Sequence, residues 1–164
     1  STMAGMAFAN AFLGMSHSMA HKIGAVHHTV HGRTNAILLP YVIRYNGTRP
    51  SKTTTWPKYN YWKADEKFQD IARMLGLPHS TPEEAVEAYA KAVYDLGVAV
   101  GIKMNFKDQG IDEKAWKDSL HEIALLAYED QCSPANPRLP MVADMEEIMA
   151  DAYYGYAERP GRRK

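Results

Sequence analysis

The sequence predicts an all-α fold, because its apolar residues recur at helical spacing and its clearest start signals belong to helices. Residues 63–75 illustrate the spacing, since Phe68, Ile71, Ala72 and Leu75 would share one helical face. No segment alternates as a strand does, and no glycine-rich phosphate loop follows a strand-like run. We therefore expect one multi-helical domain with at least six helices and at most two short strands.

The first half of the chain is expected to hold two apolar helical regions. Residues 2–27 are rich in Ala, Met and Phe, and the run Met3–Met15 is too short to cross a bilayer and lacks the basic start of a signal peptide. We interpret the run Met3–Met15 as a buried helix. Residues 32–46 form the second region, in which Pro40 should kink or break the helix. Turn-forming residues then predict a surface loop over 47–61.

The second half carries stronger boundary signals. Thr81 is a typical N-cap, Pro82 suits the first helical position, and Glu84 completes a capping box, so a helix should run to about Val100. Asp112 should start the next helix. That helix would place on one face Trp116, Leu120, Ile123 and Ala124. Residues 131–140 look irregular, a last helix is expected over 141–156, and the tail Arg159–Lys164 should be frayed.

Composition fits a single globular domain of 164 residues with one cysteine, Cys132, which cannot form a disulfide within the chain. A reducing cytoplasm is consistent with this, and we expect no membrane partner.

The charge is unevenly distributed along the chain: residues 1–64 contain seven cations and no acid, whereas the remainder holds all 19 acids. The asymmetry reflects either chance and solvated helix faces or an N-terminal part that faces acids or phosphates supplied from elsewhere. Nucleic acid is a poor candidate because the cations are not clustered.

Three histidines form the main candidate site. His17 and His21 are four residues apart, which places both imidazoles on one helical face, and His31 follows just before a new helix. Imidazoles that meet at such a corner can bind a divalent metal, although an HxxxH pair alone more often has a structural role. Ser18 stands where a zinc protease would need Glu, so that class is disfavoured.

Several stretches together resemble the iron-dependent alcohol dehydrogenases. The signature-like stretches are Gly5–Asn10, His17–Ala25, His31–Gly32 and Asn35–Pro40. Three more are similar to the C-terminal end of the bifunctional aldehyde–alcohol dehydrogenases, namely Pro50–Tyr61, Asp130–Arg138 and Asp151–Tyr156. The resemblance covers roughly residues 2–157, and it implies the helical metal-binding domain of the dehydroquinate synthase-like fold over 1–157, followed by a flexible tail over 158–164.

The resemblance also assigns roles to single residues. It implies that His17 and His31 are two of the family's four metal ligands and that His21 lies near the nicotinamide, where it orients the cofactor or relays a proton. Phe8 matches a residue that packs near the cofactor, and Cys132 matches one that lines the substrate pocket, although for both we favour plain core packing over a direct catalytic role. Asn136–Arg138 would shape a pocket-side loop or staple it. The role of His28 is not assigned, and no motif includes His27, His79 or His121, which we expect to be structural or surface residues.

Two departures from the family pattern indicate that the chain lacks part of the family's metal and cofactor site. The other two ligands lie in an Asp-x-x-x-His motif, but no histidine here has Asp four positions before it, and the dinucleotide-binding glycine segment is missing. We therefore expect the chain to be a fragment of a longer protein, without the α/β nucleotide-binding domain that would supply the acidic ligand and bind NAD(H). Val30 stands where the family usually has Pro, and Ser133-Pro134 where it has Thr-Gly, which affects loop geometry.

The implied function is the C-terminal part of an NAD-linked, iron-dependent alcohol dehydrogenase that reduces acetaldehyde to ethanol reversibly in ethanol fermentation. Fe²⁺ is the expected metal, with Zn²⁺ possible, and a divalent cation would polarise the aldehyde carbonyl while NADH supplies the hydride. The alternative is a helical assembly module, a filament interface of the same enzyme that is inactive when isolated. A third reading is a stand-alone metal-binding helical protein. The full-length protein is expected to form a homo-oligomer or filament.

Overall fold

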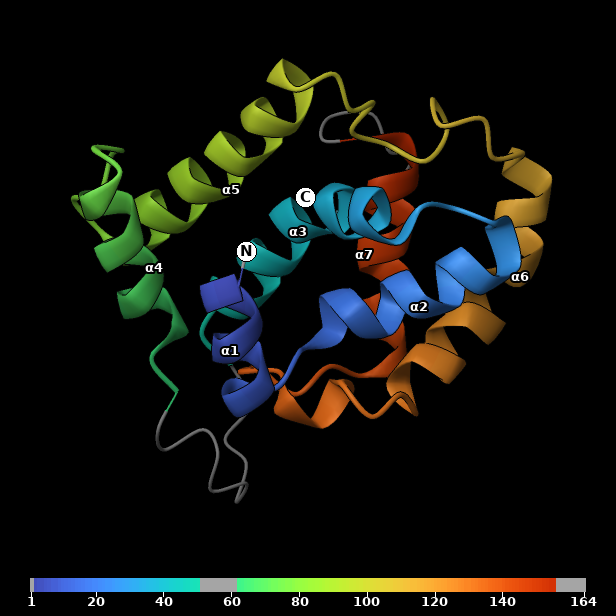
Figure 1. Ribbon diagram of the computed structural model, residues 1–164, viewed down its shortest axis with the longest axis horizontal. Coiled ribbons are helices and arrows are strands. Elements are labelled where there is room, and N and C mark those ends of the chain that lie inside the picture. The colour runs from blue at the N-terminus through green and yellow to red at the C-terminus, as the bar shows by residue number, and fades with distance from the viewer. Residues whose placement is uncertain (1, 51–61, 156–164) are drawn as a thin grey trace.

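The computed structural model describes residues 2–50 and 62–155, and throughout this part the chain is helical, with no strand (Figure 1). The helices are α1 (Thr2–Ala11), α2 (Met15–His27), α3 (His31–Gly47), α4 (Ala64–Met74), α5 (Pro82–Ala99), α6 (Glu113–Tyr128), the 3-10 turn η2 (Ser133–Ala135) and α7 (Val142–Tyr154). The all-α prediction with at least six helices is confirmed. None of the described helices is long and apolar enough to cross a membrane.

The core forms where α2, α3, α6 and α7 meet. Met19 and Ile23 of α2, Leu38 of α3, Ile123 of α6 and Met149 of α7 belong to one buried cluster. Helices α4 and α5 form a separate pair that packs on α3 through a smaller cluster. Figure 1 shows this pair along one side of the molecule, away from α6. The faces of α2 and α3 are therefore fixed from several sides, which matters for the histidines that they carry.

The predicted helix starts of the second half are present. The Thr81 hydroxyl accepts a hydrogen bond from the Glu84 backbone N–H at 3.2 Å, and Pro82 is the first residue of α5. The Glu84 carboxylate accepts from the Ser80 backbone N–H at 2.7 Å, one residue earlier than a standard capping box. Asp112 caps α6 by accepting from the Ala115 N–H at 2.9 Å. Side-chain oxygens at these positions satisfy backbone donors that the helix leaves free, which explains why the sequence located them well.

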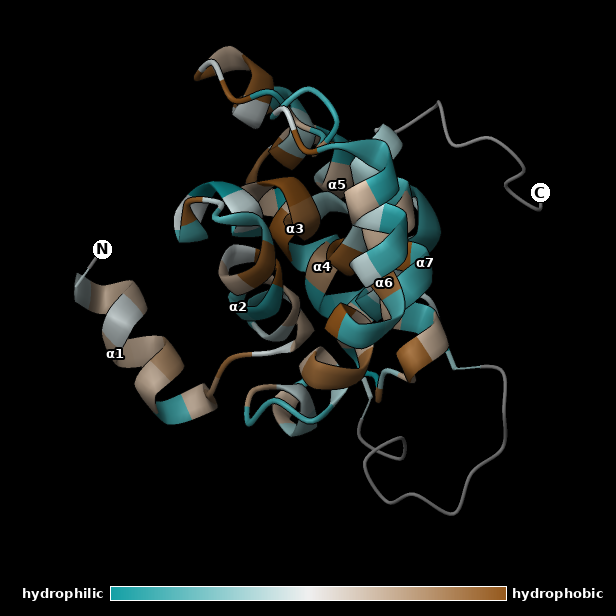
Figure 2. Ribbon diagram, turned by 90° about the vertical axis from the view of Figure 1, so that its right-hand side faces the viewer, coloured by the Kyte–Doolittle hydropathy of each residue, from teal (hydrophilic) through white to brown (hydrophobic). Residues whose placement is uncertain are grey.

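The expected buried helix near the N-terminus is wrong for this chain. Residues 2–27 form two helices, because the backbone breaks at Phe12, whose φ is 61°. Helix α1 has no buried residue, and it stands apart from the body of the molecule in Figure 2. Met15, by contrast, is fully buried at the start of α2. Apolar composition predicted that this surface is covered, but no described part of this chain covers α1.

Pro40 does not break its helix. Helix α3 continues through Pro40 to Gly47, and the proline ring is buried. Packing on α2 and α5 holds the helix despite the missing backbone donor. The predicted loop over 47–61 and the frayed tail lie largely or wholly outside the described residues.

Asn136 joins the irregular segment before α7 to the start of α2. Its Oδ1 accepts from the Met15 backbone N–H at 3.2 Å, and its amide donates to Asn46 at 2.7 Å and to the Arg138 carbonyl at 2.6 Å. A side chain at Gly14 would meet Oδ1 at 2.7 Å, so glycine is needed there. This network fixes where α2 begins and acts as the staple that the sequence suggested for this loop.

We expect Asn136→Ala to lower the free energy of unfolding by about 2–3 kcal/mol, because it leaves the Met15 N–H and the Asn46 amide buried without this partner. Urea denaturation measures the change. Asn10→Ala is the matched control: Asn10 is exposed and bonds only within α1, so its effect should stay within about 0.5 kcal/mol. Equal effects of the two variants would contradict the assignment.

The exposed apolar residues of α1, together with Phe12 directly after it, should make the isolated chain self-associate. Met3, Met6, Phe8 and Phe12 expose 84%, 66%, 51% and 73% of their surface, and a patch of this kind is unfavourable in water. Light scattering should detect species heavier than 18.4 kDa. Met6→Ser/Phe12→Ser should shift them towards monomer, whereas the control Met74→Ser/Leu96→Ser, on residues of similar exposure, should not. A monomeric wild-type chain would show that this prediction is wrong.

Candidate metal centre

Three imidazoles converge between the ends of two helices. His17 and His21 lie on α2, and His31 is the first residue of α3. The ring centroids of His17 and His31 are 5.3 Å apart, those of His21 and His31 are 5.3 Å apart, and those of His17 and His21 are 6.1 Å apart. The predicted convergence is therefore present.

The corner between α2 and α3 produces this arrangement. His28 ends α2 in a left-handed conformation with φ of 53°, and Val30 is extended before α3 begins. The Thr29 and Thr34 hydroxyls are 2.6 Å apart, and the Thr34 hydroxyl also donates to the Val30 carbonyl. This turn is short and hydrogen-bonded, so the first residue of α3 is held beside the exposed edge of α2.

The environment favours the neutral form of the His17 imidazole. Burial, followed by the repulsion of positive charge on His31 and on His21, lowers the pKa of His17 below 6.5. A neutral ring presents the lone pair that a metal needs. The Asn35 amide lies 3.2 Å from His31 Nε2 and orients that ring. His31 is exposed and His17 is half-buried, so the cluster is open on one side.

These residues fit part of a divalent metal site. Imidazole nitrogen is a good ligand for Fe²⁺ and Zn²⁺, and the rings lie close enough to share an ion after small side-chain adjustments. The charge on such an ion needs a carboxylate, and among the described residues the carboxylate beside this cluster, Asp130, is already paired with Lys22. The residues present therefore fit only part of a metal site.

Asp130 is the site residue that reasoning from histidine spacing missed. It follows α6, and its Oδ2 lies 3.3 Å from His21 Nδ1 and 2.9 Å from Lys22 Nζ. Burial alone would raise the pKa of Asp130, but donation from the Cys132 backbone N–H, Lys22 and His21 holds that pKa well below its usual range. The only signal in the sequence was its place in the segment Asp130–Arg138.

His21, Asp130 and Cys132 also lie close enough together to be considered as a separate metal site, with ligand atoms within 4.8 Å of one another. The Lys22 ammonium contacts the same carboxylate oxygen that faces His21, so a positive charge already neutralises this carboxylate. A dication there would have to displace Lys22. Coulomb repulsion thus disfavours this group as a metal centre.

Cys132 and Phe8 differ in burial. The Cys132 residue is 8% exposed, and burial, with the neighbouring Asp130 carboxylate, raises the pKa of its thiol. It is therefore a neutral thiol close to His21. Phe8 lies on α1 and is half-exposed, so core packing of Phe8 within this chain is wrong.

The other histidines have separate partners. His27 stacks on Trp116 with ring centroids 5.2 Å apart and bonds to the Ser119 hydroxyl at 3.0 Å. His79 contacts the Leu77 carbonyl, and His121 pairs with Glu146.

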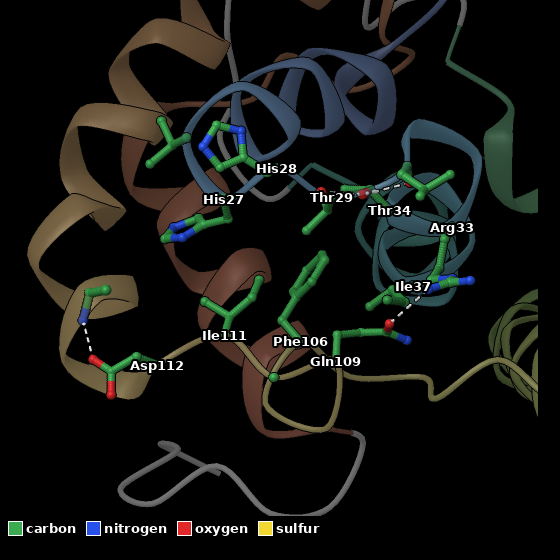
Figure 3. A pocket seen from close by; sticks show the side chains of 14 residues that line it. His27, His28, Thr29, Arg33, Thr34, Ile37, Phe106, Gln109, Ile111 and Asp112 are labelled. Carbon is green, nitrogen blue, oxygen red and sulfur yellow. Dashed lines mark hydrogen bonds between the residues drawn. The ribbon is translucent and has the colours of Figure 1, made fainter.

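His27 and His28 line a pocket of about 410 Å³ beneath the α2–α3 corner, closed on its far side by the loop before α6 (Figure 3). None of the three clustered histidines lines this pocket.

His27 should make stability depend on pH. Burial, followed by the charge of His28, lowers the pKa of His27 below 6.5, so the unfolded chain binds the proton more readily than the folded chain. The free energy of unfolding should therefore fall as the pH drops below 6.5. Urea denaturation across this range measures the slope, and NMR titration gives the pKa directly.

Two variants check the assignment to His27. His28→Ala should raise the pKa of His27 towards 6.5, because a positive neighbour is removed. His27→Gln keeps a donor for Ser119 but cannot titrate, so it should reduce the pH dependence to the part that His17, whose pKa is also lowered, contributes. An unchanged slope in His27→Gln would count against this explanation.

Comparison with known proteins places this geometry in a family. A family model described as the C-terminal part of the Fe-containing alcohol dehydrogenase family matches residues 1–153. The aldehyde-alcohol dehydrogenase of Streptococcus pneumoniae (strain D39) is 80% identical over 164 residues, which are 100% of this chain and 19% of that protein. Aldehyde-alcohol dehydrogenase 2 of Entamoeba histolytica is 59% identical over 95% of this chain and 18% of its own length.

Solved structures agree with the sequence relatives. The structure of an alcohol dehydrogenase from Oenococcus oeni superposes with a TM-score of 0.75 and 32% identity, covering 92% of this chain and 35% of that one. The chain spans about a fifth of the length of the curated relatives named above. With helical fold, histidine cluster and family match in agreement, the chain belongs to the iron-containing alcohol dehydrogenase family and corresponds to its C-terminal region.

Proposed function

We propose that this chain supplies two metal ligands, His17 and His31, to the active site of an NAD-linked alcohol dehydrogenase that reduces acetaldehyde to ethanol reversibly. The observation that carries the proposal is the convergence of three imidazoles at the α2–α3 corner. Two helices bring together imidazole rings of the kind that divalent metals bind. Fe²⁺ is the proposed metal, and Zn²⁺ is the alternative.

The bound metal would act as a Lewis acid on a carbonyl oxygen, and NADH would supply the hydride. The chain's own contribution is more specific. His17 and His31 would hold the ion, and His21, stacked on His31, would pass a proton to the product oxygen or orient the nicotinamide. Cys132 is proposed to line the substrate pocket, and Phe8 on the exposed helix α1 is proposed to pack near the cofactor.

The remaining parts of the site are proposed to lie outside this chain. The relatives are named aldehyde-alcohol dehydrogenases, and the chain covers 19% of the first of them. A nucleotide-binding domain would supply the acidic ligand and bind most of the NAD(H). The acid-free residues 1–64, with seven cations, would face those negative groups. The reducing cytoplasm is the proposed compartment.

The exposed helix α1 favours a second role in assembly. Its apolar residues have no partner among the described residues and would be covered by the preceding domain or by another copy of the protein. In that role the chain would carry an interface of a homo-oligomer or filament. It would then bind no metal on its own.

Metal titration separates the two roles. We expect calorimetry to show weak binding of Zn²⁺ or Co²⁺ by the isolated chain, because two or three imidazoles without a carboxylate stabilise a dication poorly. His17→Ala and His31→Ala should remove this binding, whereas His79→Ala and His121→Ala, which have partners elsewhere, should leave it unchanged.

Activity should be absent from the isolated chain with Fe²⁺, NADH and acetaldehyde. In the full-length protein, His17→Ala should abolish aldehyde reduction and deplete the metal, while His79→Ala should retain both. Full activity in the isolated chain, or unchanged metal content in full-length His17→Ala, would refute the proposed role.

A further inference from the structure

Asp130 is a carboxylate with an unusually complete set of donors. Its Oδ2 faces His21 Nδ1 at 3.3 Å and Lys22 Nζ at 2.9 Å, and its Oδ1 accepts from the Cys132 backbone N–H at 3.0 Å. The Cys132 sulfur lies within 4.8 Å of the carboxylate. The side chain is only 7% exposed, so these groups replace the water that it would bind on the surface.

This donor set fixes the chemical state of the contact with His21. The Lys22 ammonium and the Cys132 backbone N–H keep Asp130 ionised, and an ionised carboxylate only accepts hydrogen bonds. The nitrogen of His21 that faces it, Nδ1, must therefore carry the proton. In the neutral ring the lone pair is then on Nε2, at the opposite side of the imidazole.

The ring that Asp130 holds is also in contact with the two proposed ligands. The His21 ring stacks on His31 with an interplanar angle of 16°, and it meets the His17 ring edge-on at 71°. Asp130 follows the end of α6, and its carboxylate meets the His21 ring at Nδ1. A proton on Nδ1 and a fixed ring plane together aim one basic nitrogen away from the carboxylate.

We propose that Asp130 is a positioning residue that holds His21 in the Nδ1–H tautomer, so that Nε2 is the atom that gives or takes the proton in aldehyde reduction. The proton-transfer part rests on the proposed function, whereas the tautomer does not. Lys22 supports the arrangement, because it is the residue after His21 on α2 and neutralises the shared carboxylate. Metal-ligand and catalytic histidines in other enzymes are held by carboxylates in the same way.

NMR of the chain with ¹⁵N-labelled histidine tests the tautomer directly, without metal. At about pH 8.5, two units above the ordinary imidazole pKa of about 6.5, the rings are neutral and the two nitrogen shifts identify the protonated atom. We expect Nδ1–H for His21 in the wild type. A wild-type ring protonated mainly on Nε2 would overturn the proposal, and this measurement needs no variant to fold.

Asp130→Asn gives the matched perturbation. An amide has a similar shape but can turn its NH₂ towards His21 Nδ1, so the population should shift towards the Nε2–H tautomer. Glu146→Gln is the control, since Glu146 pairs with His121 on the surface and should leave the His21 nitrogen shifts unchanged. An Asp130→Asn spectrum in which folded His21 keeps the wild-type tautomer would overturn the proposal.

The full-length, metal-loaded dehydrogenase tests the proton role. Asp130→Asn should lower kcat by about 10–100-fold with a much smaller change in the KM for aldehyde, at unchanged metal content. Glu146→Gln should keep both constants. A changed tautomer with an unchanged kcat would overturn the positioning role. A wild-type protein without metal-dependent aldehyde reduction would instead overturn the proposed function and, with it, the proton role, while the tautomer result would stand.

Discussion

Between His27 and His31 the chain passes from one helix to the next in three residues, and the geometry of the histidine cluster depends on this corner. A left-handed His28 costs conformational energy, and the burial of α2 and α3 in a common core offsets it. Because the two helices are packed on their inner faces, the rings on their outer edges have little freedom. The core therefore determines where the imidazoles lie, although none of them belongs to it.

Local signals in the sequence predicted much of this fold. Thr81 and Asp112 act within one helical turn, so their caps could be recognised without knowing the tertiary structure. The i,i+4 spacing likewise placed His17 and His21 on one face. Of the kink or break expected at Pro40, the break is wrong, because α3 packs on α2 and α5 and continues through the proline.

The missed parts are contacts between distant residues. Asp130 is 109 positions from His21, and no spacing rule connects them; the short link between α6 and η2 brings the carboxylate to the start of the chain. Asn136 is similarly 121 positions from Met15. Both come from the irregular segment between α6 and α7, which the sequence identified only as lacking helical pattern. Through Asn136 that segment holds the start of α2 at Met15, and through Asp130 it holds the His21 ring six residues later.

The positions of the acidic residues explain why the histidine cluster has no free carboxylate among the described residues. Asp130 is the acidic group in contact with the histidines among the described residues, and it is satisfied by Lys22, His21 and Cys132. It therefore cannot also neutralise an ion between His17 and His31 without releasing Lys22. Residues 1–64 contain seven cations and no acid, and two of these cations are paired with acids from the rest of the chain, Lys22 with Asp130 and Arg44 with Glu87. We therefore propose that the carboxylate needed by a metal at His17 and His31 comes from outside the described residues.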